Sequence, residues 1–234
     1  MTATEKARQL VARRREEILA EATALFAREG YARAKVDDVA LTLGLGKGTI
    51  YRYFPTKEKL FLAAADRAME DLQRSILGAV EQFDDPFARI RAAVRTYLEF
   101  FDRNLSLVEI FIHERAEFRD RKRPTYLAYR DKNLRNLEVV LGRLKAQGLV
   151  RDVDERVAAA IMGDLLYGTV ITHLLRGGRR SLAALAPQIV DLIFHGLLTP
   201  AGSAFARASG APARRPARAA ARERAASARR ARRT

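Results

Sequence analysis

The sequence lacks cysteine and tryptophan altogether, and it holds only seven prolines in 234 residues. Without cysteine there is neither a disulfide framework nor a thiolate metal site. The three histidines are scattered and do not show the spacing of a zinc site. The motifs of phosphate-binding loops and of the serine nucleophile elbow are also missing. We therefore expect no metal and no cofactor, and the sequence does not favour an enzyme.

Long hydrophobic runs are scarce as well. Residues 1–17 are charged throughout, unlike the apolar stretch of a signal peptide. The most membrane-like segment, residues 157–175, includes Asp164 and His173, which are costly in lipid, and no second span accompanies it. We expect this segment to be a core helix of a soluble, cytoplasmic protein without membrane contact.

Positive charge is abundant but unevenly distributed. The formal net charge is +15, yet residues 61–200 are close to neutral. Residues 201–234 carry ten arginines against the single Glu223, and residues 1–60 carry a smaller excess. Hydrophobic residues make up 48% of the chain, which is enough to bury a core. This pattern favours a DNA-binding end beside a neutral domain over a protein coated in nucleic-acid contacts.

The most informative stretch is residues 36–57, where the helical period predicts two short helices around a glycine-rich corner. The first helix has an apolar face at i, i+3, i+4 and i+7, formed by Val36, Val39, Ala40 and Leu43. Gly44 ends this helix, because glycine adopts the left-handed cap conformation without steric penalty. Leu45 is then expected to be buried inside the corner.

The second helix is expected over residues 46–54, with Ile50 and Phe54 facing inward. Pro55 ends it, since the residue before a proline avoids the helical region. Two helices joined by a short turn containing glycine predict a helix-turn-helix, whose second helix fits the DNA major groove. Its exposed side consists of Lys47, Gly48, Thr49, Tyr51, Arg52 and Tyr53. No acid follows before Glu58, as expected of a surface that contacts phosphates.

Several motifs here resemble the DNA-binding domain of the TetR family of bacterial repressors. They are Gly-Tyr at 30–31, V-D-D-V-A at 36–40, L-G-L-G-K-G-T-I-Y-R-Y-F at 43–54 and P-T-K-E-K-L at 55–60. The resemblance implies an all-α protein with an N-terminal three-helix DNA-binding domain, followed by an α-helical ligand-binding and dimerisation domain. It further implies a ligand-released repressor that binds double-stranded DNA at a pseudo-palindromic operator as a homodimer, with a small-molecule effector.

The expected DNA-binding residues are Lys35, Lys47, Gly48, Thr49, Tyr51, Arg52, Tyr53 and Lys57. Lys47, beside the bare backbone of Gly48, is expected to contact base edges. By resemblance to the family's positions, Thr49, both tyrosines and Lys57 are expected to hold phosphates. Arg52 is expected to contact either bases or phosphates.

Two positions depart from the family's usual pattern. Ala34 and Lys35 stand where a serine or threonine usually precedes the first of these helices, and Gly46 stands where a serine usually precedes the second. Both are helix N-caps, where losing a side-chain oxygen costs about 0.5–2 kcal/mol, although glycine loses only a few tenths. Asp37 and Asp38 partly compensate through the helix dipole. We expect the fold to survive these changes.

The rest of the chain is expected to be helical, because no stretch alternates with period two for long enough to form a strand. Residues 13–29 form an amphipathic helix, preceded at 1–12 by a basic, frayed arm that either reaches DNA or is simply solvated. A long helix over 57–83 links the two parts and, by resemblance, transmits ligand binding. Further helices are expected from Pro86, from Ser106 or Asn104 to Phe118, from Pro124 to Gln147, from Asp152 or Asp154 to Arg176 and from Ser181 to Leu198. The expected domains are residues 1–56 (DNA-binding), 57–199 (regulatory) and 200–234 (a disordered Arg/Ala-rich tail).

The last two of these helices are the most apolar pair and are expected to form the dimer interface. Their expected contact residues are Leu166, Val170, Leu174, Leu185, Ile189, Leu192 and Ile193. Gly163 and Gly168 would let helices approach closely. Two copies would form a four-helix bundle around a two-fold axis, which places two reading helices in successive major grooves.

A ligand pocket in the regulatory domain is expected by resemblance. Its candidate lining is Phe101, Phe111, His113, Tyr126, Tyr129, Tyr167 and His173, with Phe87 and Tyr97 as further aromatic groups. Aromatic residues at helical spacing also fit a plain core, and this alternative stays open. His113 lies in a run where Glu114, Arg115, Glu117 and Arg119 predict a salt-bridged surface.

The Arg-rich tail either raises non-specific DNA affinity, binds an acidic surface or has no selected role. Two other classes of function remain as alternatives to a specific regulator. One is an enzyme that uses His113, Glu114 and Glu117 as acid–base groups. The other is a non-specific chromosome-organising protein that uses the tail.

Overall fold

The computed structural model of the chain describes residues 2–178 and 181–196. The chain divides into two compact units, Met1–Val190 and Asp191–Thr234, and residues 191–196 are the described part of the second. The expected tail at 200–234 lies outside the described residues, as do the last two positions of the helix expected to end at Leu198.

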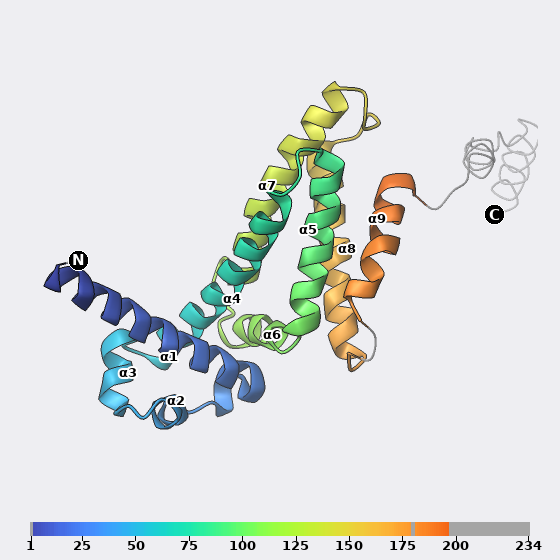
Figure 1. The fold of residues 1–234 in the computed structure, drawn as a ribbon. Helices are drawn as coiled ribbons and strands as arrows, with labels where there is room; N and C mark the ends of the chain where they lie inside the picture. The colour runs from blue at the N-terminus through green and yellow to red at the C-terminus, as the bar shows by residue number, and fades with distance from the viewer. Residues whose placement is uncertain (1, 179–180, 197–234) are drawn as a thin grey trace, which may run out of the picture. The chain divides into compact units, whose positions relative to one another are not determined.

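Three helices make up the N-terminal part of the first unit: α1 (Ala3–Arg33), α2 (Val36–Thr42) and α3 (Lys47–Tyr53) (Figure 1). Their apolar faces meet in a small core, because Ile18, Phe26, Val39 and Ile50 are at most 1% exposed. Gly30 interrupts α1 with φ at 71°. The helix therefore bends where the sequence predicted its end, and it continues for one more short turn.

The N-terminal arm is helical, so the expectation of a frayed segment over residues 1–12 was wrong. The Thr2 hydroxyl accepts a hydrogen bond from the Glu5 backbone N–H at 3.2 Å, and the Thr2 backbone N–H donates to the Glu5 carboxylate at 2.6 Å. This reciprocal capping box satisfies donors that would otherwise favour fraying. Residues 4–13 are all exposed, so the first turns of α1 extend beyond the small core.

The remaining elements are also helical, which confirms the all-α fold class for the described residues. They are α4 (Lys57–Val80), α5 (Pro86–Arg103), α6 (Leu107–Glu117), α7 (Thr125–Ala146), α8 (Glu155–Leu175), η1 (Ala183–Leu185) and α9 (Ala186–His195). Within the first unit, α4 packs against α5 and α7, α7 lies along α8, and α5 contacts α8 and η1 (Figure 1). Large side chains such as Leu72, Leu98, Phe101 and Leu144 are fully buried between these helices.

Helices α1, α4 and α6 meet around an aromatic group that joins the N-terminal helices to the helical body. Phe61 of α4 lies 5.0 Å from Phe26 and 5.1 Å from Tyr31, measured between ring centroids. Phe118, which follows α6, lies 4.9 Å from Tyr31 and 5.7 Å from Phe61. Thr56 caps α4 as expected, since its hydroxyl accepts a hydrogen bond from the Lys59 backbone N–H. The two parts are therefore in continuous apolar contact.

Asp102, near the end of α5, holds the segment that leads into α9. Its carboxylate accepts hydrogen bonds from the Ser181 hydroxyl at 2.6 Å and from the backbone N–H groups of Leu182 and Ala183 at 2.9 and 3.4 Å. Burial pushes the pKa of Asp102 upward, but these hydrogen bonds, with the nearby His173, bring it below its ordinary value. The sequence predicted Ser181 as a cap, and the Ala184 N–H does donate to it at 3.3 Å. The shorter hydrogen bonds to this segment come from Asp102 of α5, and not from the Ser181 cap.

Candidate functional site

The turn between α2 and α3 has the geometry of a Schellman motif. The Leu45 N–H donates to the Ala40 carbonyl at 2.8 Å, and the Gly44 N–H donates to the Leu41 carbonyl at 3.1 Å. Gly44 has φ at 63°, a conformation that glycine adopts without steric cost. Leu45 is half-buried rather than fully buried, because the turn lies at the surface. The predicted helix-turn-helix is therefore present, and its turn is fixed by backbone hydrogen bonds.

Helix α3 is anchored on one side and open on the other. Ile50 is 0% exposed and Phe54 is 4% exposed, as the spacing predicted. Lys47, Gly48 and Arg52 are exposed. Thr49, Tyr51 and Tyr53 are half-exposed. The six predicted DNA-binding residues that belong to α3 thus lie on the accessible part of a helix whose other side is fixed in the core.

The structure adds an acid to this surface. Lys47 Nζ lies 2.7 Å from Asp37 Oδ1 and 3.1 Å from Asp37 Oδ2. This hydrogen bond raises the pKa of Lys47 above its ordinary value. Helix α3 itself carries no acid, as the sequence indicated, but the turn brings Asp37 of α2 beside it. No signal within residues 46–54 could have revealed this contact, which joins positions on different helices.

Lys57 and Lys35 occupy different surroundings. Lys57 Nζ donates to the Ala32 carbonyl at 3.2 Å and lies 4.7 Å from the centroid of the Tyr31 ring. Burial lowers the pKa of Lys57, and Glu117 partly opposes this effect. Lys35 is exposed and stands at the N-cap of α2, where no side-chain hydrogen bond caps the helix. The cap of α3 at Gly46 likewise has no side-chain hydrogen bond, as the sequence departures predicted.

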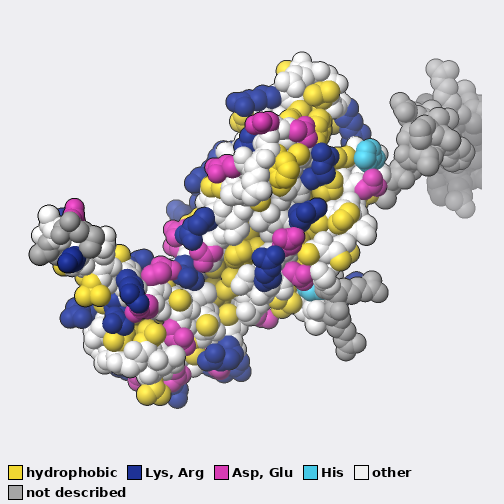
Figure 2. All heavy atoms as spheres, in the orientation of Figure 1, with side chains coloured by type: hydrophobic (Ala, Val, Ile, Leu, Met, Phe, Trp, Pro, Cys, Tyr) yellow, Lys and Arg dark blue, Asp and Glu magenta, His cyan; other side chains and the backbone are white. Residues whose placement is uncertain are grey.

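Charge on the surface is mixed. Figure 2 shows Lys and Arg side chains interspersed with acids over the face in view. Several basic residues are paired within α1, for example Arg13 and Arg14 with Glu17 at 3.1 and 2.8 Å. Arg15 instead lies over the Phe54 ring, 5.2 Å from its centroid. The basic charge on the face in view is therefore not gathered at one place (Figure 2).

Four of the seven predicted pocket residues come together in the helical body, with Tyr97 as a fifth member. The Tyr97 and Tyr126 hydroxyls are 2.9 Å apart. Ring centroids are 5.0 Å apart for Tyr97 and Phe101, 5.6 Å for Phe111 and Tyr126, and 4.7 Å for Tyr126 and Tyr167. Burial raises the pKa of Tyr97 well above its ordinary value and raises that of Tyr126 to about 12. This aromatic cluster is packed core, and its two phenol hydroxyls are hydrogen-bonded to each other.

Arg130 is a residue that the sequence did not single out. It is 17% exposed, donates to the Ala160 carbonyl at 3.3 Å and pairs with Asp164. Its charge acts on Tyr97 and Tyr126 and opposes the rise in their pKa values. A guanidinium therefore lies at the edge of the aromatic cluster, where Asp164 balances its charge.

The other three predicted pocket residues lie elsewhere. His113 of α6 packs against Gly30, where an added Cβ would meet its Nε2 at 2.6 Å. Tyr129 lies near the acids Asp66 and Glu70 of α4, which, after burial, raise its pKa. His173 lies near Gly178 at the end of α8.

Glu114 is buried, whereas the sequence predicted that it lies on a salt-bridged surface. It is 1% exposed and accepts hydrogen bonds from Arg121 Nη1 at 2.6 Å and from the backbone N–H and hydroxyl of Thr125 at 2.9 and 3.1 Å. Its second oxygen, Oε2, has no hydrogen-bond partner among the described residues. The carboxylate joins α6 to the start of α7, a contact that helical periodicity does not reveal.

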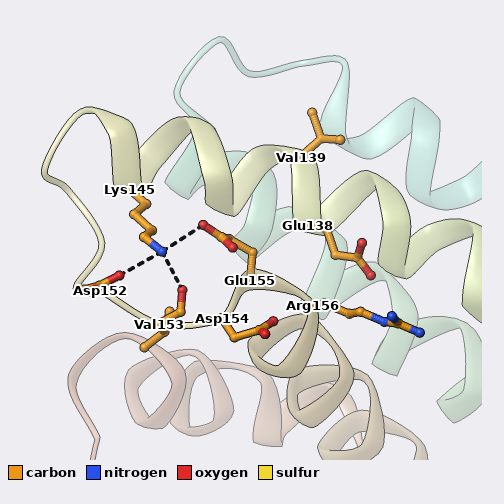
Figure 3. A pocket seen from close by; sticks show the side chains of 8 residues that line it. All are labelled: Glu138, Val139, Lys145, Asp152, Val153, Asp154, Glu155 and Arg156. Carbon is orange, nitrogen blue, oxygen red and sulfur yellow. Dashed lines mark hydrogen bonds and ion pairs between the residues drawn. The ribbon is translucent and has the colours of Figure 1, made fainter.

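A hollow of about 660 Å³ lies at the turn between α7 and α8 (Figure 3). The Lys145 ammonium points into it and contacts Asp152 Oδ1 at 2.8 Å, the Val153 carbonyl at 2.9 Å and Glu155 Oε1 at 3.2 Å. Because the Lys145 ammonium already contacts these oxygens, the arrangement stabilises the turn between α7 and α8. Within the described ranges, no group of three or more His, Asp or Glu side chains is arranged to hold a metal ion.

The expected dimer residues are divided between core and surface. Val170 and Ile189 are buried within the first unit, at 2% and 8% exposure, whereas Leu166, Leu174 and Leu185 are half-exposed. Leu192 and Ile193 belong to the second unit. Gly163 faces α7, since an added Cβ would lie 2.9 Å from Leu134, and Gly168 faces open space.

The exposed side of α8 instead carries apolar residues that the sequence reasoning did not select. Val157 and Ile161 are 53% and 62% exposed, and Leu175 is 76% exposed. Asp164, Gly168 and Thr172 lie on the same exposed stripe. A groove of about 830 Å³ is lined by Asp164, Gly168 and Thr172 of this stripe, by other α8 residues that include His173, and by Leu185. Among the described helices, α8 alone is long and apolar enough to cross a membrane, a test that core helices also pass.

Comparison with known proteins gives a consistent result. Residues 18–64 match the family described as "Bacterial regulatory proteins, tetR family", and residues 84–197 match "Tetracyclin repressor-like, C-terminal domain". The chain is 27% identical over 189 residues to the HTH-type transcriptional repressor KstR2 of Rhodococcus jostii (strain RHA1), covering 80% of this chain and 92% of the relative.

Two further proteins extend the comparison. The nucleoid occlusion factor SlmA of Vibrio cholerae is 30% identical over 153 residues, which cover 63% of this chain and 76% of that protein. The solved structure of PfmR from Thermus thermophilus, a TetR family transcriptional regulator, is similar with a TM-score of 0.64 and 27% identity. It covers 78% of this chain and 99% of its own.

Proposed function

The chain belongs to the tetR family of bacterial regulatory proteins, and from this premise we propose that it is a repressor that binds a pseudo-palindromic operator as a homodimer and is released by a small molecule. Members of this family are DNA-binding regulators that respond to small molecules, and they are not enzymes. The expectation that the chain is not an enzyme is therefore confirmed by its family. Soluble, cytoplasmic localisation follows for a DNA-binding regulator.

The observation that carries the proposal is the orientation of α3. Its apolar side is fixed in the core through Ile50 and Phe54, while Lys47, Arg52 and the two tyrosines remain accessible. A helix held in this way can enter a major groove as a rigid body. We assign Lys47 to base edges and Thr49, Tyr51, Tyr53 and Lys57 to phosphates, with Lys35 and Arg52 at the margins of the contact.

The proposed homodimer rests on the surface of α8. An 18-residue window of this helix has a mean hydropathy of 1.4, yet only 11% of that window is buried within one chain. Exposed apolar stripes of this kind are commonly covered by a second copy across a two-fold axis. A dimer would also supply two copies of α3 for the two halves of an operator.

Release by an effector is proposed to begin at the aromatic cluster. A ligand that enters between Tyr97, Tyr126 and Tyr167 would separate helices α5, α7 and α8. Helix α6 contacts α1 through His113 and Gly30, so movement of the body would reach the N-terminal helices. A ligand that favours such an arrangement shifts the population away from the DNA-binding state.

A second candidate function is non-specific chromosome organisation, which the ten arginines of residues 201–234 favour. Both candidates bind DNA, and they differ in how strongly the protein prefers one site. A specific regulator is expected to keep its site against random DNA at physiological salt by about 10³-fold or more.

The deciding experiment is selection of bound duplexes from a random pool, followed by sequencing. A recovered inverted repeat would establish both specificity and two-fold symmetry, and a pool without an enriched repeat would contradict the proposal. The division of roles is tested on the recovered site. Tyr51→Phe is expected to weaken binding to all sequences about equally, whereas Lys47→Ala is expected to relax preference at one position of each half-site.

A further inference from the structure

The contact between Asp37 and Lys47 links two helices at the surface that faces DNA. The side chains are 59% and 57% exposed, and Nζ lies 2.7 Å from Oδ1. Exposed ion pairs contribute little net stability. The turn between α2 and α3 is already held by backbone hydrogen bonds and by Val39 and Ile50 in the core. The pair is therefore not required to hold these helices together.

A carboxylate at this position has an electrostatic consequence. Phosphates repel it, so Asp37 lowers affinity for DNA of every sequence unless the DNA offers it a hydrogen-bond donor. Phosphates offer no donors, whereas the major groove offers the amino groups of cytosine N4 and adenine N6. A favourable partner for Asp37 is therefore a base edge.

The neighbouring ammonium narrows the choice of base pair. An A·T pair also offers an adjacent acceptor and donor, thymine O4 and adenine N6, but the commonest specific contact of lysine is to guanine O6 and N7, and aspartate accepts from cytosine N4. Guanine O6 and cytosine N4 are adjacent on the major-groove edge of one base pair. Lys47 and Asp37 present a donor and an acceptor side by side in the same way.

We propose that Lys47 and Asp37 act together to read one G·C base pair in each half-site, with Asp37 as the specificity-determining residue for its cytosine. This inference rests on the proposed recognition of an operator. Asp37 accepts from cytosine N4 while Lys47 donates to the guanine. A base pair that places a hydrogen-bond acceptor opposite the carboxylate is rejected.

The test uses the full chain and four variants: Asp37→Asn, Asp37→Glu, Asp38→Asn and Lys47→Ala. Asp38 is the matched control, because it is exposed, lies one residue along the same helix and undergoes the same change of charge. Each protein selects from the random duplex pool. Dissociation constants are then measured for the recovered site and for all its single base-pair changes, at one salt concentration.

For the unchanged chain, replacing the contacted cytosine is expected to weaken binding by about 5- to 100-fold, the range of one good base contact. In Asp37→Asn this discrimination is expected to fall several-fold at that base pair, where Lys47 still contacts the guanine, and to persist unchanged at the other positions. Asp37→Glu, which keeps the carboxylate, should retain the preference for cytosine. Asp38→Asn should leave every positional preference unchanged.

Each other outcome has a distinct meaning. If the unchanged chain recovers no repeat, the proposed function fails. If a repeat is recovered but Asp37→Asn changes no position selectively, the inference about Asp37 is overturned and the carboxylate acts only by repelling phosphates. A selectively affected base pair without cytosine also overturns it. Circular dichroism melts of each variant show whether a lost preference is due to lost fold.

Discussion

Glu114 is a buried carboxylate that holds two helices and a loop together. It lies in α6 and accepts hydrogen bonds from Arg121 in the following loop and from Thr125 at the start of α7. A charge in such surroundings is tolerated because a guanidinium and two neutral donors face one of its oxygens. Removing it leaves those donors without an acceptor in a site that excludes water.

We predict that Glu114→Ala lowers the free energy of unfolding by about 2–3 kcal/mol, the cost of leaving buried donors and a partly buried guanidinium unpaired. Urea denaturation followed by circular dichroism measures the change. Glu117→Ala, at an exposed position of the same helix, is the control and should stay within about 0.5 kcal/mol of the original chain. Equal effects of the two substitutions would contradict this role of Glu114.

The phenol pair of Tyr97 and Tyr126 makes stability depend on alkaline pH. Burial raises both pKa values, that of Tyr126 to about 12. An unfolded tyrosine ionises near pH 10, so from about pH 10 to 12 the folded chain binds more protons than the unfolded chain. Stability from this pair is therefore fully present below about pH 10 and is lost as the pH rises toward 12.

We predict that the urea midpoint of the original chain falls between about pH 9.5 and 11.5, and that it falls less in Tyr126→Phe, which lacks one of the buried phenols. At about pH 7 the same substitution should cost about 1–2 kcal/mol, because the Tyr97 hydroxyl loses its partner. Denaturation at each pH measures both effects. Tyr53→Phe, at a half-exposed position of α3, is the control; a parallel fall in all three proteins would exclude the pair as the cause.

At the scale of elements, α6 presses on the bend of α1. Gly30 has φ at 71°, and an added Cβ would meet His113 Nε2 at 2.6 Å and Cε1 at 2.8 Å. Gly44 has a similar φ of 63°, but nothing lies within 4 Å of an added Cβ there. Alanine substitutions at the two glycines therefore distinguish the cost of backbone strain, present at both, from the cost of steric contact with another helix, present only at Gly30.

We predict that Gly44→Ala costs about 1–2 kcal/mol, from left-handed backbone alone, and that Gly30→Ala costs more, because His113 must also move. Truncating the imidazole in the double variant Gly30→Ala/His113→Ala should remove the excess, measured as the coupling energy of a double-mutant cycle. Additive effects in that cycle would mean that α6 does not press on α1 at this point.

Helices α2 and α3 and the start of α4 could be predicted because their sequence signals are local. Gly44 and Pro55 bound the two short helices within a few residues, and Thr56 caps the next. The first turns of α1, expected to be a frayed arm, were misjudged although their signal is equally local, since Thr2 and Glu5 have the spacing of a capping box. The basic composition of the arm concealed it.

Contacts between helices that are far apart along the chain could not be predicted from the sequence. Tyr97 and Tyr126 are 29 positions apart, and Asp102 and Ser181 are 79 positions apart. Helical periodicity identifies which residues face inward but not which helix they face. The same limit explains why Val170 was selected for the dimer although it is buried in its own chain, while the exposed Ile161 was passed over.

At the scale of the whole molecule, α8 carries apolar residues that a single chain leaves exposed to water. Val157, Ile161 and Leu175 lie along one side of the helix, with Asp164, Gly168 and Thr172 between the last two, and Gly168 leaves room for close approach of another helix. Covering this stripe with a second copy would remove apolar area from water at about 25 cal/mol per Å². A dimer would also hold two copies of α3 in one assembly, so a change that weakens dimerisation should also weaken affinity for the operator.

We predict that the original chain sediments as a dimer and that Ile161→Glu sediments as a monomer, because a carboxylate would be buried at the interface without a partner. Sedimentation velocity measures the association state, and binding to an inverted repeat should weaken by about tenfold or more while binding to an isolated half-site changes little. Val139→Glu, at a 54% exposed position of α7, makes the same chemical change away from the stripe and should remain dimeric. If Ile161→Glu sediments as the original dimer does, the copies meet through another surface.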